Sequence, residues 1–177
     1  MDKEFKNNTY RILELFMNNP NKDFSIRGMA RNLKISHATV INYITDLEKL
    51  RLIKKKNETL YPTYYANTEN DKLKFYKKNY ITFKIKETGV IEYIKNKTLP
   101  SSIVLFGSCA KGEYKKNSDI DIFVEAQETR LDISKFEKIL KRNINLLFEK
   151  ELMNLSAELR NNILNGIILY GFVKLRG

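Results

Sequence analysis

The chain has 177 residues, 42% of them apolar, and its 32 Lys and Arg against 21 Asp and Glu give a net charge of +11. This length allows one ordinary domain or two small ones with hydrophobic cores, and the composition excludes a disordered chain. No apolar run approaches the roughly 18 residues of a membrane span, and the start has no signal-peptide core, so we expect a cytoplasmic protein with no membrane partner. A single cysteine, Cys109, and a single histidine, His37, exclude an internal disulfide and a Cys/His zinc site. Any metal would therefore have oxygen ligands.

The positive charge is concentrated in the first part of the chain. Residues 1–66 hold 12 basic and 7 acidic side chains, residues 67–100 hold 8 and 4, and residues 101–177 hold 12 and 10. Such an excess favours polyanionic partners such as nucleic acid or nucleotides. A Lys- and Asn-rich composition that merely reflects a biased genome is the alternative.

The first third of the chain predicts three short helices. Apolar residues from Asn8 to Met17 follow a helical period, and Pro20 ends that segment. Ser25 and Ser36 are the predicted N-caps of a second helix, to Leu33, and of a third, to Leu50. Two helices separated by a tight turn are typical of a helix-turn-helix.

A basic two-stranded hairpin follows the third predicted helix. Arg51–Lys56 and Thr59–Ala66 are expected to be strands on either side of a turn at Asn57 and Glu58. With this hairpin as its wing, the segment from about Tyr10 to Ala66 resembles the winged helix-turn-helix family. The resemblance predicts a DNA-binding domain at residues 1–66.

In that family the third helix lies in the major groove of double-stranded DNA. The resemblance implies that residues at its start and on its polar face contact base edges, because Asn can pair with adenine and Thr can contact a thymine methyl group. Basic residues of the second helix and the wing would contact phosphates. The expected DNA-binding residues are Arg27, Arg31, Lys34, Ser36, His37, Thr39, Asn42, Tyr43, Lys54, Lys55 and Lys56. Pairing with a protein or with a second copy, as a homodimer, is the alternative use of this surface.

Residues 67–97 are predicted to form a helical connector. The segment contains no Pro, one Gly and eight Lys, and its apolar residues recur at helical intervals. We expect either one long helix or two helices joined near Gly89. The sequence "KTLP" at residues 97–100 is the predicted boundary to a second domain, residues 98–177.

The second domain opens with the stretch "IVLFGSCAKGEYKKNSDIDIFV", residues 103–124. A buried-strand pattern leads into Gly107 and Ser108, and a second one contains Asp119 and Asp121. A charge within an apolar sheet must be paired or bound, and carboxylates two residues apart on a strand can hold one divalent cation together. Backbone N–H groups near Gly107 and Ser108 can cradle a phosphate. Together these features predict a site for a nucleoside triphosphate with Mg2+ or Mn2+.

The spacing Gly-Ser, ten residues, Asp-x-Asp resembles the minimal nucleotidyltransferase family of the DNA polymerase beta superfold. The flanking positions of the family pattern are met by Ala110, Lys111, Gly112, Glu113 and Ser118. The resemblance implies an α+β fold in which Gly107, Ser108 and Lys111 bind the triphosphate and the catalytic residues Asp119 and Asp121 bind metal. It further implies transfer of a nucleoside monophosphate to a hydroxyl group of a protein or nucleic acid.

The sequence departs from the family at the third carboxylate. On the later strand "RNINLLFEK" the corresponding residue is Asn145, whose amide oxygen can bind a cation but cannot take up a proton at neutral pH. Glu149 is about 13 Å further along the strand and does not replace it. We therefore expect the triphosphate site to be preserved and catalysis to be weakened or lost.

Three functions remain open from the sequence. The chain is a Mg2+-dependent nucleotidyltransferase that binds DNA, or a DNA-binding transcriptional regulator that responds to a nucleotide without turnover. The family resemblance adds an antitoxin-like protein with a toxin partner as a third. The nucleotide, the acceptor and the DNA target are not specified by the sequence.

Overall fold

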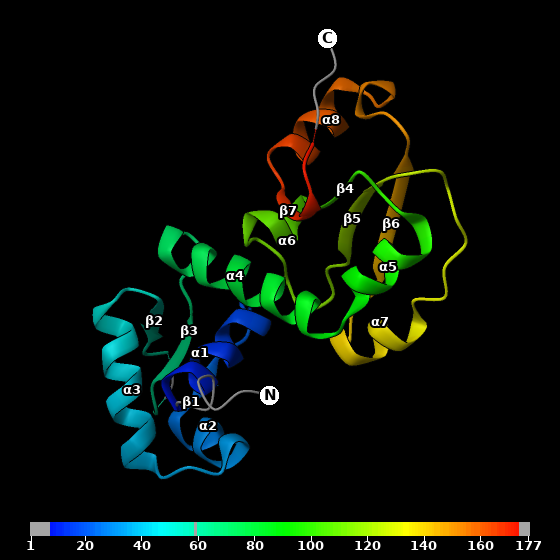
Figure 1. The fold of residues 1–177 in the computed structure, drawn as a ribbon. Helices are drawn as coiled ribbons and strands as arrows, with labels where there is room; N and C mark the ends of the chain where they lie inside the picture. Colours follow the sequence, from blue (N-terminus) through cyan, green and yellow to red (C-terminus); the bar gives the residue numbers. More distant parts are fainter. Residues whose placement is uncertain (1–7, 59, 174–177) are drawn as a thin grey trace. The chain divides into compact units, whose positions relative to one another are not determined.

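The computed structural model describes residues 8–58 and 60–173, and the chain divides into two compact units, Met1–Tyr76 and Lys77–Gly177. Helices and two separate sheets make up these units, in agreement with the α+β class expected from the sequence. Within the described residues, no helix is both long enough and apolar enough to cross a membrane. Figure 1 labels the elements of both units.

The three predicted helices of the first unit are present as α1 (Asn8–Asn18), α2 (Ile26–Leu33) and α3 (His37–Lys49). Ser25 accepts a hydrogen bond from the backbone N–H of Gly28, and Ser36 accepts one from Thr39, so both predicted N-caps are confirmed. Each cap satisfies a backbone donor that the helix leaves free, which stabilises the helix by about 1 kcal/mol. The buried faces of the helices form one core that includes Ile12, Phe16, Met29, Val40, Ile44 and Leu47.

The predicted hairpin is formed by β2 (Ile53–Lys56) and β3 (Thr63–Ala66), which pair antiparallel. Both strands are shorter than expected. Arg51 has φ +57° and belongs to the turn after α3, and Pro62 has no N–H to donate to a strand pair. Thr59, the predicted first residue of the second strand, lies outside the described residues. A short strand that the sequence did not indicate, β1 (Phe24–Ser25), pairs with β3 and completes a sheet of order β1-β3-β2.

The segment expected to connect two domains forms two helices that break at Gly89, which is the second of the two arrangements expected from the sequence. Helix α4 (Asp71–Glu87) is followed by α5 (Val90–Thr98), and Gly89 between them has φ +76°, a conformation that glycine adopts without strain. The boundary between the two compact units falls inside α4, after Tyr76. The rest of α4 and all of α5 contribute core residues to the second unit: Ile81, Ile85, Val90, Ile91 and Ile94.

The second unit is built on a four-stranded sheet of order β6-β5-β4-β7. Its strands are β4 (Ser102–Phe106), β5 (Ile120–Glu125), β6 (Ile144–Glu149) and β7 (Ile167–Gly171). β4 runs antiparallel to both β5 and β7, whereas β5 and β6 are parallel, so these two strands begin at the same end of the sheet. This common end positions the site described below.

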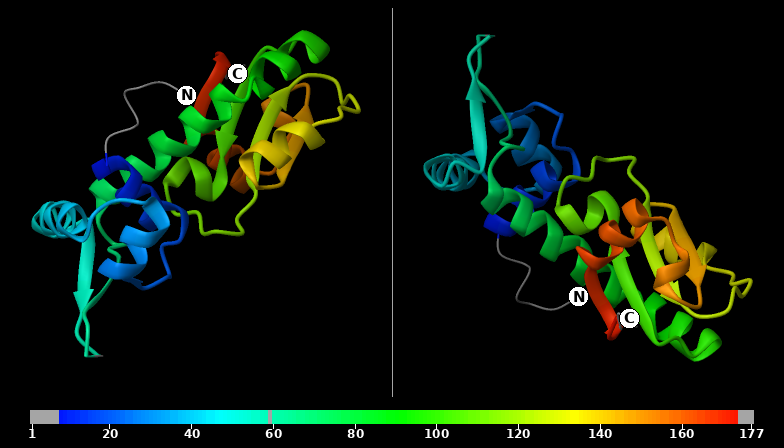
Figure 2. Two further views of the ribbon diagram at one scale, coloured as in Figure 1. Left: turned by 90° about the horizontal axis from the view of Figure 1, so that it is seen from below. Right: turned by 90° about the horizontal axis from the view of Figure 1, so that it is seen from above.

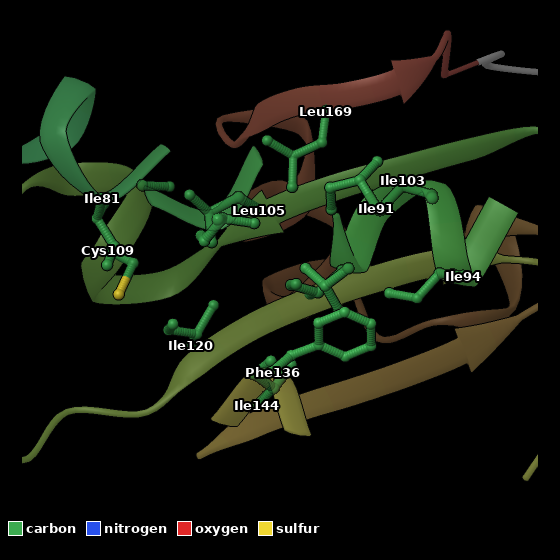
Figure 3. Close-up of a cluster of buried hydrophobic side chains, with 14 of the residues drawn as sticks. Ile81, Ile91, Ile94, Ile103, Leu105, Cys109, Ile120, Phe136, Ile144 and Leu169 are labelled. Carbon is green, nitrogen blue, oxygen red and sulfur yellow. The ribbon is translucent and has the colours of Figure 1, made fainter. Parts of the chain in front are cut away.

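Helices cover both faces of this sheet (Figure 2). On one face, α5, α6 (Gly107–Lys111) and α7 (Ser134–Leu140) pack on alternate strand residues such as Ile103, Ile120 and Ile144 (Figure 3). On the other face, a 3-10 turn (Leu152–Asn154) and α8 (Ala157–Leu164) pack on Val104 and Phe123. Because strand side chains alternate, Asp121 and Asn145 belong to the second face, the face of α8.

Candidate functional site

Three polar side chains meet where β5 and β6 begin. The parallel register places Asp121 directly beside Asn145. The Asn145 amide Nδ2 donates to Asp121 Oδ1 at 3.0 Å and lies 3.5 Å from Asp119 Oδ2, while Asn143 Nδ2 donates to Asp119 Oδ1 at 3.1 Å. The structure therefore brings Asp119, Asp121 and Asn145 together and adds Asn143, which no pattern in the sequence indicated.

Gly107 lies against the carboxylate of Asp121. A Cβ atom built on Gly107 would come within 2.6 Å of Asp121 Oδ2, and Gly107 also has φ +69°. Both observations require glycine at this position, because any side chain would strain the backbone and displace the carboxylate. The turn after β4 and the carboxylate of β5 therefore form one close-packed arrangement.

The two remaining predicted nucleotide-binding residues lie on α6. Ser108 is half-buried, and its carbonyl accepts a hydrogen bond from Glu113 N–H, which closes the turn after the helix. Lys111 is exposed, and its Nζ lies 3.5 Å from Asn162 Oδ1 of α8. Its side chain therefore reaches the face of the sheet that also carries Asp121 and Asn145.

The loop that leads to Asp119 is held by two cations that the sequence did not single out. Lys77 of α4 is 2% exposed and donates to the Tyr114 carbonyl at 2.7 Å, and the Tyr114 hydroxyl donates back to the Lys77 carbonyl at 3.2 Å. Arg142 donates to the carbonyls of Lys115 and Ser118 at 2.8 and 2.7 Å. Both cations also lie over the Tyr114 ring, 4.5 and 4.9 Å from its centroid. Lys77 is one of eight lysines in residues 67–97, so the sequence pattern does not distinguish it from the other seven.

Burial changes the pKa of two groups near this loop. Desolvation and the neighbouring Arg142 charge lower the pKa of Lys77 to about 8, so its charge is only weakly favoured at neutral pH. Burial also raises the pKa of the Cys109 thiol to about 11, and its Sγ donates to the Asp119 carbonyl at 3.4 Å. The thiol stays protonated, which supports a packing role and not a nucleophilic one.

The three converging side chains fit a hard divalent cation. Two carboxylates and an amide oxygen are the oxygen ligands that Mg2+ or Mn2+ prefers. Turning the Asn145 amide by half a rotation would direct its oxygen, in place of Nδ2, toward the carboxylates. Among the residues that the structure describes, no group of three or more His, Cys, Asp or Glu side chains could hold a metal ion. A cation at this site would therefore rely on two carboxylates and not three.

The residues of α3 expected to contact DNA bases lie on the exposed side of that helix. His37 and Asn42 are exposed, and Thr39 and Tyr43 are half-buried. The hydroxyl of Ser36 is engaged in the cap, because it accepts from Thr39 N–H and lies 2.7 Å from the Thr39 hydroxyl.

The expected phosphate contacts differ in how much their charges are already compensated. Lys56 lies 2.9 Å from a Glu58 carboxylate oxygen and 3.6 Å from one of Asp23, whereas Lys54 and Lys55 are exposed. The hydrogen bond and charge of Glu58 raise the pKa of Lys56. Arg27, Arg31 and Lys34 are exposed on and after α2, and Arg27 stacks 5.1 Å from the Tyr61 ring centroid.

A mixed sheet that carries paired aspartates beside a glycine turn is the arrangement that the second unit shows, and it is typical of a phosphoryl-transfer domain. Comparison with known proteins identifies it more closely: the family model "Nucleotidyltransferase domain" matches residues 87–170. The protein of Methanocaldococcus jannaschii named "Putative protein adenylyltransferase MJ1379" is 39% identical over 69 residues, which are 34% of this chain and 69% of that protein. The chain belongs to the nucleotidyltransferase family.

A solved structure is also similar to part of the chain. It is described as the crystal structure of the toxin-antitoxin with AMP-PNP, and it is 29% identical in sequence. The match covers 49% of this chain and 73% of that chain, with a TM-score of 0.39.

Proposed function

We propose that the second unit binds a nucleoside triphosphate with Mg2+ or Mn2+ and transfers the nucleoside monophosphate to a hydroxyl group of a protein. The observation that carries this proposal is the convergence of Asp119, Asp121 and Asn145 against Gly107. A protein acceptor is favoured over a nucleic-acid acceptor by the name of the archaeal relative, a protein adenylyltransferase.

In the reaction an acceptor oxygen attacks the α-phosphorus, the bond to the bridging oxygen of the β-phosphate breaks, and pyrophosphate leaves. A divalent cation, when bound, would neutralise charge on the phosphates and lower the pKa of a coordinated hydroxyl. Asp119 and Asp121 would hold such a cation, and the Gly107–Ser108 turn and Lys111 would bind the triphosphate. The Asn145 amide cannot take the proton of the hydroxyl, so the proton passes to Asp119 or to solvent.

The test is incubation of the full chain with each α-labelled nucleoside triphosphate and Mg2+ or Mn2+, with the chain itself and a mixture of cellular proteins as acceptors. We expect label transfer by the native chain and none by the Asp119→Ala, Asp121→Ala double variant. Glu128→Ala, which removes an exposed carboxylate away from the site, is the control. Equal transfer by the native chain and the double variant would contradict the proposal.

Asn145 favours a second function, a nucleotide-responsive regulator without turnover. The amide donates hydrogen bonds to both carboxylates and so stabilises the pair without a third negative charge. In this case the native chain binds the triphosphate in a metal-dependent way, measured by calorimetric titration, but transfers no label. Label transfer that appears in the Asn145→Asp variant but not in the native chain would favour this second function over the first.

We further propose that the first unit is a winged helix-turn-helix that binds double-stranded DNA through α3 and the β2–β3 hairpin. The order of α1, β1, α2, α3, β2 and β3 supports this proposal, as do the exposed His37, Asn42, Lys54 and Lys55. The DNA target and the oligomeric state, including a homodimer on paired half-sites, are to be measured by footprinting and by analytical ultracentrifugation.

A further inference from the structure

A pocket of about 450 Å3 lies next to Asp119 and has no role in the site as described so far. It is formed by the loop that leads into β5, by α7, and by the segment that leads into β6. Its volume lies in the range of about 300–1,000 Å3 that small-ligand pockets have. It can therefore hold one or two side chains of a bound segment.

The pocket lies on the side of Asp119 away from the expected triphosphate position. Asp119 lines the pocket, whereas Asp121, Gly107 and Ser108 do not. Gly107 contacts Asp121, so the glycine turn marks the other side of the carboxylate pair. A group in the pocket would approach Asp119 without occupying the space next to Gly107 and Ser108.

Four cationic side chains and two carboxylates line this pocket, and they are Lys116, Lys138, Lys141, Arg142, Asp119 and Glu137. Both carboxylates are engaged, because Glu137 accepts a hydrogen bond from Ile144 N–H and Asp119 accepts from Asn143. Arg142 is engaged by the two loop carbonyls. Lys116, Lys138 and Lys141 are exposed and carry the charge that the pocket offers to a ligand.

We propose that this pocket binds the acceptor, and that the acceptor is an acidic protein segment in which a hydroxyl side chain is flanked by carboxylates. The flanking carboxylates pair with Lys116, Lys138 and Lys141, which places the hydroxyl group beside Asp119. This inference rests on the proposed transfer to a protein and adds the class of acceptor.

The lining of the pocket favours a peptide over a nucleic-acid end. Proteins that read single-stranded nucleic acid stack its bases on aromatic side chains, and none of the lining residues is aromatic. Lysines on flexible stems suit carboxylates at variable positions, whereas bidentate recognition of phosphate relies on arginine. Here the single arginine is held by the backbone.

The experiment measures equilibrium binding to the full chain by fluorescence anisotropy, without nucleotide. The labelled probes are a peptide with a tyrosine flanked on each side by two glutamates, the same peptide with glutamines, and a short single-stranded RNA. The variant Lys116→Ala, Lys138→Ala, Lys141→Ala is compared with Lys86→Ala, Lys97→Ala, Lys150→Ala, which removes the same charge from exposed positions outside the pocket.

We expect the glutamate peptide to bind at least tenfold tighter than the glutamine peptide, and the pocket variant alone to lose this preference. Equal affinity of the native chain for the two peptides would overturn the inference. An equal loss of affinity for the glutamate peptide in the pocket variant and in the control variant would also overturn it. If the RNA binds more tightly than the glutamate peptide, and only the pocket variant loses affinity for the RNA, the inference is overturned in favour of a nucleic-acid acceptor. Label transfer is measured separately, so pocket-dependent peptide binding without any transfer rejects the proposed reaction and leaves the pocket assignment intact.

Discussion

The two units carry their functional candidates in different ways. In the second unit, side chains at the beginning of β5 and β6 lie within hydrogen-bonding distance of one another, and Gly107 in the turn after β4 lies against one of them. In the first unit, the candidate DNA contacts are exposed or half-buried and are distributed over α2, α3 and a hairpin. A convergent site depends on each member, whereas a distributed surface acts through its summed charge. Single substitutions should therefore be severe in one unit and mild in the other.

The substitution with the largest expected effect is Gly107→Ala, which tests whether the convergent site depends on the contact between Gly107 and Asp121. The new Cβ would come within 2.6 Å of Asp121 Oδ2, so we expect at least about a hundredfold loss of nucleotide transfer or, in the sensor function, of nucleotide binding. Gly89→Ala is the matched control, because Gly89 also has positive φ but has nothing within 4 Å of its Cβ position. It should lower stability by about 1 kcal/mol and leave the site intact. Equal activity losses in the two variants would show that strain and not the contact matters.

The distributed surface is tested by the salt dependence of DNA binding. Lys54→Ala with Lys55→Ala should reduce the slope of log affinity against log salt by about 1.8, and affinity by roughly tenfold or more at physiological salt. Lys56→Ala should change the slope much less, because Glu58 and Asp23 already pair with this lysine. Electrophoretic mobility shifts over a range of salt concentrations measure both slopes. A larger effect from Lys56 would contradict the ion pairing as the reason.

The substitution Asn145→Asp tests whether residue 145 is the third ligand of a cation in the convergent site. A third carboxylate beside two others should lower the melting temperature of the variant in the absence of a divalent cation. Added Mg2+ should then raise the melting temperature of the variant more than that of the native chain. We expect transfer to increase about tenfold. Asn143→Asp is the control, since Asn143 contacts Asp119 but is not paired with Asp121. Melting curves with and without MgCl2 report the result, and an equal Mg2+ effect in both variants would count against Asn145 as the third ligand.

The smallest expected effect is a pH dependence of stability from Lys77. Its folded pKa of about 8 lies below the ordinary value of 10.5, so the folded state binds fewer protons than the unfolded state between these values. The free energy of unfolding should therefore rise with pH through this window, by about 1–2 kcal/mol from pH 7.5 to 9.5. Lys77→Met should remove this rise, and Lys72→Met, at an exposed position of the same helix, should keep it. Urea denaturation at the two pH values measures the difference.

The sequence predicted the parts of this molecule that depend on local pattern. The caps at Ser25 and Ser36 and the strand that carries Asp121 follow from residue type and spacing, whereas the break at Gly89 was one of two arrangements that the pattern allowed. Asn145 could be placed only through the family resemblance, which expects a third carboxylate on a later strand, and the parallel register of β5 and β6 sets this residue beside Asp121. The roles of Lys77, Tyr114 and Arg142 could not be predicted, since they depend on contacts between residues 24 to 37 positions apart.

Helix α4 belongs to both compact units of the chain. It begins in the first unit and ends in the second. A fragment cut at residue 98 would lose α4 and α5 and expose the isoleucines and valines of β4 and β5 that these helices cover, so it should aggregate. A recombination event that exchanges the first unit for another must therefore join the new unit within α4, before Ile81, so that the second unit keeps the helices that cover its sheet.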